Sequence, residues 1–73
     1  MTLNKNEAIR ERLAEEISKL PYKNFQIAFR IDCDPSVISK YRLGVHLPGA
    51  YHLAGLYELG VDVIYVLTGE RTR

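Results

Sequence analysis

Apolar residues recur at helical spacing along most of the chain, and polar residues, prolines and glycines separate the repeats. The first repeat has intervals of three or four residues, as expected for one face of an α-helix. It consists of Ile9, Leu13, Ile17 and Leu20. Asn4 followed by Glu7 makes a capping-box pair at the beginning of this helix. Pro21 ends it, because proline disfavours helical backbone at the residue before it.

Two shorter helices are predicted in the middle of the chain, over residues 24–31 and 35–43. Asp34 before Pro35 is typical of an N-cap followed by proline at the first helical position. Gly44 is suited to ending the second of these helices. The residues expected to face inward are Ile27, Ala28 and Ile31 in the first and Val37, Ile38 and Tyr41 in the second.

The last third of the chain predicts helices over residues 50–59 and 63–68. Gly60 ends the first of them, and Asp62 and Gly69 bound the second. The second segment is also rich in β-branched residues, which strands favour. The flanking caps nevertheless favour a helix.

One compact all-α domain of five helices is therefore expected over residues 1–73. Its core is expected to contain Ile9, Leu13, Ile17, Ile27, Ala28, Ile31, Cys33, Ile38, Tyr41, Leu53, Leu56 and Leu59. The last helix adds Val63, Tyr65 and either Val66 or Leu67. A chain of 73 residues buries only about 60% of its unfolded surface, so association with a partner chain would stabilise it.

The composition is that of a globular protein, with 47% hydrophobic and 26% charged residues. No apolar run approaches the roughly 18 residues that cross a bilayer. The polar first ten residues contain no signal-peptide core. The single cysteine, Cys33, excludes an internal disulfide. We therefore expect a soluble cytoplasmic protein that has no membrane partner.

Candidate catalytic and metal-binding groups are sparse. Ser36 and Ser39 have no neighbouring base to activate them. His46 and His52 lack a third ligand at useful spacing, so a structural role outweighs metal binding. Cys33 lies between two aspartates, which raise the pKa of a thiol rather than activate it. We expect no enzyme activity, no cofactor, no metal and no small-molecule substrate.

The charge is unevenly distributed, although the net charge is only +1. The first twenty residues are balanced, and their charges include the pairs Arg12–Glu16 and Glu15–Lys19 at helical i,i+4 spacing. Residues 21–46 have four cations against two carboxylates: Lys23, Arg30, Lys40 and Arg42 against Asp32 and Asp34. This small central excess is weak support for a nucleic-acid partner when taken alone.

Residues 24–44 resemble the lambda-repressor-like, Cro-type helix-turn-helix family. Ala28 stands where that family has a small residue between the two helices, and Cys33 stands at its small apolar turn position. The sequence GVHLP at residues 44–48 is similar to the family's GxxLP connection, and LTGE at residues 67–70 is similar to its ending. The resemblance implies a lambda-repressor-like DNA-binding fold, with the helix over residues 35–43 in the major groove.

The resemblance also implies site residues. Base contacts would come from the outward residues of the recognition helix: Pro35, Ser36, Ser39 and Lys40. Phosphate contacts would come from Lys23, Asn24, Arg42 and His46. Asn24 matches a family position that bonds a phosphate, and a helix N-terminus attracts anions in any case. The alternative for Asn24 is a simple N-cap.

The implied function is a DNA-binding transcriptional regulator from a phage or prophage, acting as repressor or activator on a double-stranded operator. Asp32 replaces the usual turn glycine and is expected to take a left-handed backbone. Pro35 occupies a position at which a polar side chain often reads DNA. With the near-neutral charge, Pro35 supports an alternative: a protein-interaction module that has lost DNA binding. The chain is expected to be either a whole small regulator or the N-terminal domain of a larger repressor.

Three further expectations concern the surface. Ile64 stands where the family has a polar residue, so we expect it in the interface of a homodimer. Arg71 and Arg73 are expected to belong to a frayed terminus rather than to a DNA-binding arm. The aromatic residues Tyr22, Phe25 and Phe29 suit either a platform for stacking single strands or packing around the second helix. We favour packing.

Overall fold

The structure, a computed structural model, describes residues 4–71 and contains five helices. They are α1 (Lys5–Ser18), α2 (Asn24–Ile31), α3 (Pro35–Leu43), α4 (Ala50–Leu59) and α5 (Val63–Thr68). Residues 4–71 contain no strand, so the predicted all-α class and the helical interpretation of residues 63–68 are confirmed.

Side-chain caps begin three of the helices. Asn4 accepts a hydrogen bond from the Glu7 N–H at 2.8 Å and returns its own N–H to the Glu7 carboxylate at 3.3 Å. This reciprocal pair is the predicted capping box of α1. Asp34 accepts from the Ser36 N–H at 2.8 Å at the beginning of α3, and Asp62 caps α5 through the Tyr65 N–H at 3.0 Å.

The turn between α2 and α3 depends on one residue in a left-handed conformation. Asp32 has φ 62° and ψ 55°, the one positive φ among non-glycine residues within the described chain. Aspartate tolerates this region better than most residues. The conformation lets the N–H groups of Asp32 and Cys33 both donate to the Ala28 carbonyl, and the chain then turns into α3.

The core lies at the centre of the five helices. Its fully buried members are Leu13, Ile17, Ile27, Ala28, Ile31, Ile38, Tyr41, Leu56, Val61 and Val66. Of the remaining predicted members, Ile9, Cys33 and Leu59 are half-buried and pack against it. Leu53 is half-buried and does not join this cluster, because the inward face of α4 runs through Gly55, Leu56 and Leu59.

Close packing of α2 against α4 requires a glycine. A Cβ atom built on Gly55 would lie 2.6 Å from Cγ2 and 3.0 Å from Cβ of the buried Ile31. Both distances are shorter than ordinary van der Waals contact, so only glycine fits there without a shift of the helices. The sequence pattern of α4 gives no sign of this requirement.

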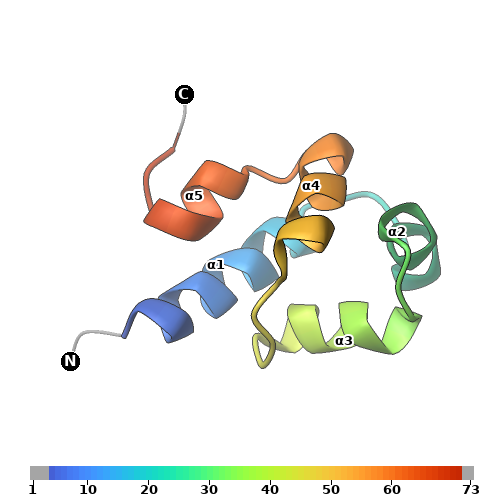
Figure 1. The fold of residues 1–73 in the computed structure, drawn as a ribbon, viewed down its shortest axis with the longest axis horizontal. Helices are drawn as coiled ribbons and strands as arrows, with labels where there is room; N and C mark the ends of the chain where they lie inside the picture. Colours follow the sequence, from blue (N-terminus) through green and yellow to red (C-terminus); the bar gives the residue numbers. More distant parts are fainter. Residues whose placement is uncertain (1–3, 72–73) are drawn as a thin grey trace.

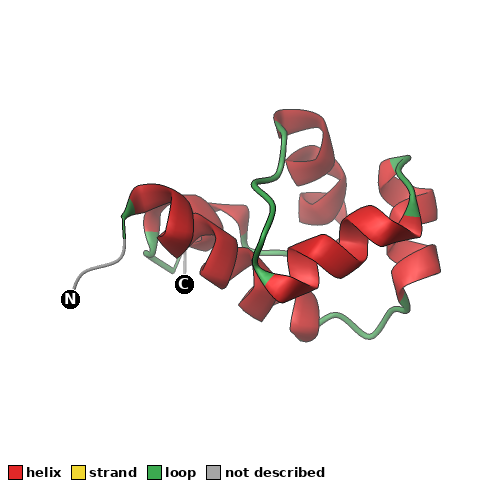
Figure 2. Ribbon diagram, turned by 90° about the horizontal axis from the view of Figure 1, so that it is seen from below, coloured by secondary structure: helices red, strands yellow, loops and turns green. Residues whose placement is uncertain are grey.

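The packing order leaves one side of α3 uncovered. α1 packs against α3 and α5, whereas α2 packs against α3 and α4. In Figure 1, α3 runs along the lower edge of the molecule, and in Figure 2, seen from below, it lies in front of the other helices. No helix in residues 4–71 is long and apolar enough to cross a membrane.

Candidate nucleic-acid interface

The uncovered side of α3 carries the four residues predicted to contact bases. Ile38 and Tyr41 point into the core, and the exposed residues of the helix therefore lie on the opposite side. The predicted set is exposed throughout: Pro35, Ser36, Ser39 and Lys40. Lys40 forms no ion pair with any residue in 4–71, so its ammonium group is available to a ligand.

A hydrogen-bond network ties the beginning of α2 to α3. The Arg42 Nε–H donates to the side-chain oxygen of Asn24 at 2.5 Å, and its Nη2 donates to the Tyr22 carbonyl at 3.2 Å. The Asn24 amide in turn donates to the Ser39 hydroxyl at 3.1 Å. Three of the predicted DNA-contacting residues, Asn24, Ser39 and Arg42, therefore lie together and hold one another in place.

Asn24 is not an N-cap, so that interpretation of it is wrong. α2 begins at Asn24 itself, and Lys23 is the capping residue. The Lys23 N–H donates to the Gln26 side chain at 2.8 Å. The first N–H groups of any helix lack intrahelical partners, so the beginning of α2 remains suited to an anion.

The other two predicted phosphate contacts lie outside this network. Lys23 is exposed and directly precedes the network. His46 lies beyond the C-terminal end of α3, where its ring is 6.5 Å from the Tyr41 ring, centroid to centroid. Lys23 is therefore next in sequence to the network, whereas His46 belongs to the link between α3 and α4.

The electrostatics of the turn agree with the prediction for its cysteine. Burial raises the pKa of the Cys33 thiol, and the carboxylates of Asp34 and Asp32 raise it further. The backbone N–H of Ser36, bonded to Asp34, lowers the pKa of that carboxyl group, which therefore remains a charged cap. Within residues 4–71, no group of three or more His, Cys, Asp or Glu residues could hold a metal ion.

The histidine of α4 has a structural partner instead. His52 Nδ1 lies 2.7 Å from the hydroxyl of Tyr41, and the two rings meet edge to face. Burial raises the pKa of Tyr41. This hydrogen bond joins α3 to the beginning of α4 and satisfies the one polar atom of a buried aromatic side chain.

The prediction that the aromatic residues pack around α2 is wrong. Tyr22, Phe25 and Phe29 are 39%, 60% and 85% exposed. The buried face of α2 runs through Ile27, Ala28 and Ile31, so residues 25 and 29, four apart, share the opposite face. The hydrophobicity of these residues does not indicate which way their rings point. Their spacing relative to the buried residues of α2 does.

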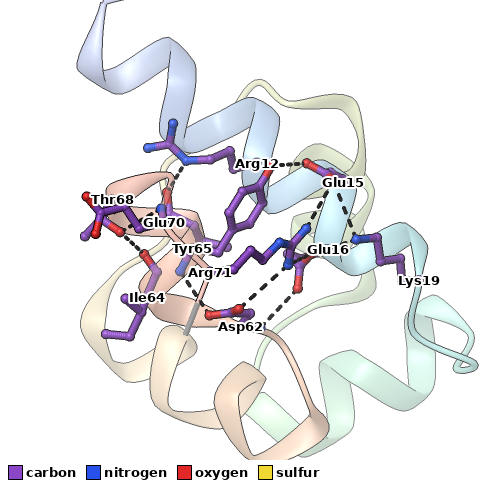
Figure 3. Close-up of polar contacts among 11 residues, drawn as sticks. Arg12, Glu15, Glu16, Lys19, Asp62, Ile64, Tyr65, Thr68, Glu70 and Arg71 are labelled. Carbon is purple, nitrogen blue, oxygen red and sulfur yellow. Dashed lines mark hydrogen bonds and ion pairs between the residues drawn. The ribbon is translucent and has the colours of Figure 1, made fainter. Parts of the chain in front are cut away.

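A polar cluster fastens α5 to α1 (Figure 3), and it overturns the expectation of a frayed Arg71. The Arg71 guanidinium lies 2.9 Å from the Glu16 carboxylate and 3.3 Å from that of Glu15. It also stacks 3.6 Å from the centre of the Tyr65 ring. Arg73 lies outside the described residues.

The predicted i,i+4 pairs of α1 are only half correct. Lys19 pairs with Glu15 at 3.5 Å. Arg12 does not pair with Glu16; its Nε–H donates to the Val66 carbonyl at 2.9 Å, near the C-terminal end of α5. For Arg12, the carbonyl group supplied by α5 therefore takes the place of the predicted Glu16 carboxylate.

Glu16 is the one charged side chain that the described chain buries, at 6% exposure. Its carboxylate accepts from the Asp62 N–H at 3.1 Å and pairs with Lys19 and Arg71. Burial is the largest influence and raises the pKa of Glu16, but the Asp62 N–H, Arg71 and Lys19 together lower it below its usual value. The charged form is therefore the one that fastens the helices.

The last helix leaves the predicted interface residue at the surface. Ile64 is 47% exposed, whereas Val66 is buried. Ile64 and Tyr57 border a hollow of about 550 Å³ between α4 and α5, lined by Tyr57, Glu58, Gly60, Val61, Asp62, Val63 and Ile64.

Comparison with models of known protein families, with curated proteins and with solved structures found no match to this chain. The functional interpretation therefore rests on the residues and their geometry.

Proposed function

We propose that the protein is a sequence-specific regulator that binds double-stranded DNA and has a lambda-repressor-like fold. The observation that carries the proposal is the uncovered face of α3 beside the network of Asn24, Ser39 and Arg42. A nine-residue helix joined to a preceding helix by a three-residue turn has the dimensions of a helix-turn-helix unit.

Within this proposal, α3 enters the major groove. Lys40 is long enough to reach the O6 and N7 acceptors of a guanine, while Ser36 and Ser39 are able to bond either base type. Pro35 offers only apolar contact, for example to a thymine methyl group. Lys23, Asn24, Arg42 and His46 contact phosphates and thereby position the helix without reading sequence.

The protein acts in the cytoplasm as a homodimer. Two recognition helices about 34–36 Å apart would read a two-fold operator in successive major grooves. The exposed Ile64 beside the hollow between α4 and α5 is the observation that supports this contact. Occupancy of the operator would exclude polymerase from an overlapping promoter, and contact with polymerase would activate an adjacent one.

Selection of bound duplexes from a random pool tests the proposal. We expect a two-fold consensus, and we expect the affinity for it to fall steeply as salt rises, because each phosphate contact releases counterions. Recovery of no consensus, together with a flat salt response, would contradict DNA binding.

A second candidate function is a protein-interaction module that has kept the fold without binding DNA. The observation that favours it is the exposure of Phe25 and Phe29 on α2, which a DNA-binding role leaves unexplained. A flat salt response would select this candidate.

A further inference from the structure

The outer face of α2 forms an aromatic hollow, which we define by its lining residues. They are Tyr22, Phe25, Gln26, Phe29, Arg30 and Leu59. The hollow has a volume of about 450 Å³. Exposed apolar surface of this kind on a small domain marks a site of interaction more often than chance, because it costs solubility.

The two phenylalanines that α2 contributes to this hollow belong neither to the core nor to the proposed DNA contact. Phe29 is the most exposed large apolar residue among residues 4–71, at 85%, and Phe25 lies one turn before it. Both lie opposite the face of α2 that enters the core. Asn24, by contrast, is directed to α3 through its bonds with Ser39 and Arg42.

The one charged residue among those that line the aromatic hollow is a cation. This residue is Arg30; outside the lining, Lys23 directly follows Tyr22 and Glu58 directly precedes Leu59. None of its lining residues is a carboxylate. Asp32 and Asp34 lie in the turn beyond the C-terminal end of α2. An occupant that is apolar on one face and anionic around it would be complementary to this surface.

We propose that the aromatic hollow docks an acidic amphipathic helix of a partner protein. Apolar side chains at i, i+3 or i+4 and i+7 of such a helix would enter between the rings and Leu59, in the helix-in-groove mode. Its carboxylates would meet Arg30. This inference does not depend on the proposed DNA binding, because α2 presents the hollow away from its contact with α3.

Two other occupants fit less well. A second copy of the chain would bring two Arg30 side chains to one apolar contact whose lining residues include no carboxylate. A single nucleic-acid strand needs a track of cations beside its stacked bases. The hollow contains one cation, Arg30, and its aliphatic residue Leu59 suits a side chain rather than a base.

The test measures binding of the full chain to a fluorescent eighteen-residue peptide with leucines at helical spacing and glutamates elsewhere. A matched peptide with lysine for every glutamate is the control. We expect saturable binding of the acidic peptide and at least about tenfold weaker binding of the basic one. Phe29→Ser should weaken acidic-peptide binding about tenfold, as loss of an aromatic anchor does. Arg30→Glu should reverse the preference between the peptides.

Tyr51→Ser, at an exposed aromatic residue outside the hollow, should leave peptide binding unchanged. Absence of saturable binding, or equal affinity for both peptides, would overturn the proposal. So would a wild-type dimer that Phe29→Ser dissociates, or binding of oligo-dT that Phe29→Ser abolishes. Duplex binding by Phe29→Ser should match wild type, which separates a failure here from a failure of the proposed DNA binding. If Phe29→Ser loses helicity, the peptide preference of Arg30→Glu still tests the proposal.

Discussion

The Arg42 guanidinium bonds the side-chain oxygen of Asn24, joining the last turn of α3 to the first residue of α2. The same guanidinium also reaches the Tyr22 carbonyl, so it braces the segment that enters α2. The relative position of the two helices therefore depends on a forked donor, and only arginine supplies one.

Replacing Arg42 should destabilise the domain even without DNA. Arg42→Ala leaves the Asn24 oxygen and the Tyr22 carbonyl without this donor, at a cost of about 1 kcal/mol given the half-exposed site. Arg42→Lys should recover only part of the loss, because an ammonium group lacks the planar fork. Thermal unfolding measures both, with Lys40→Ala as the control on the same helix. A lysine variant as stable as wild type would contradict the bracing role.

The contact of Gly55 with Ile31 predicts the outcome of a substitution that helix propensity alone would favour. Ala54→Gly, at the neighbouring exposed position, should cost about 1 kcal/mol. By helix propensity alone, the opposite kind of substitution at the next residue, Gly55→Ala, would raise the stability by a similar amount. We expect it instead to lower the thermal midpoint, since overpacking costs about 1–3 kcal/mol. A raised midpoint for Gly55→Ala would show that α2 and α4 separate freely.

Glu16 predicts a pH dependence of stability. Its folded pKa is lowered from the usual 4.5, so its contribution is present above that value and is lost as the pH falls through the folded pKa. Glu16→Gln should cost about 1–3 kcal/mol at neutral pH, and it should flatten the decline of stability on the acid side. Urea unfolding at several pH values measures this.

Glu11→Gln is the matched control, because Glu11 is exposed on α1 and forms no ion pair within residues 4–71. Its pH profile should follow that of wild type. Identical acid limbs for wild type and Glu16→Gln would mean that other carboxylates, such as Glu15, carry the dependence.

Local signals predicted the helices well because each boundary has its cause within a few residues. Asn4, Asp34 and Asp62 accept from N–H groups two or three positions later. Gly44 and Gly60 end helices with positive φ values of 73° and 112°. Such contacts can be read from the sequence without knowledge of the fold.

Long-range contacts were the ones that sequence patterns missed. Glu16 is buried because Asp62 and Arg71, some fifty positions away, supply its partners. Val61 enters the core from the short link between α4 and α5, where no periodicity marks it. In the candidate interface, the exposed face of α3 followed from its buried face, but the bond of Arg42 to Asn24 did not.

The surface of α5 predicts how the chain associates. Ile64→Asp should weaken the proposed homodimer, because a charged group would enter an apolar contact. Helicity should persist, since aspartate is favoured in the first turn of a helix. Sedimentation at several concentrations measures the dimer, and Tyr51→Asp is the control at another exposed position. Wild type and Ile64→Asp sedimenting alike as monomers at high concentration would exclude this interface.

Lys40 and Asn24 should differ in how they affect DNA binding. Lys40→Ala should cost about 1–3 kcal/mol per half-site and relax the preference at one base position, if Lys40 bonds a guanine. Asn24→Ala should weaken binding to all duplexes alike, because a phosphate contact has no sequence information. The comparison requires affinities for a panel of single-base operator variants.

The network around Asn24 sharpens this comparison, because Asn24→Ala also removes the partner of Arg42. The thermal midpoint of each variant must therefore accompany its binding profile. An even loss of affinity for Lys40→Ala across the panel would make Lys40 a phosphate contact and leave specificity to Ser36, Ser39 and DNA shape. If neither substitution alters binding to any duplex, α3 does not read DNA and the protein-interaction module takes its place.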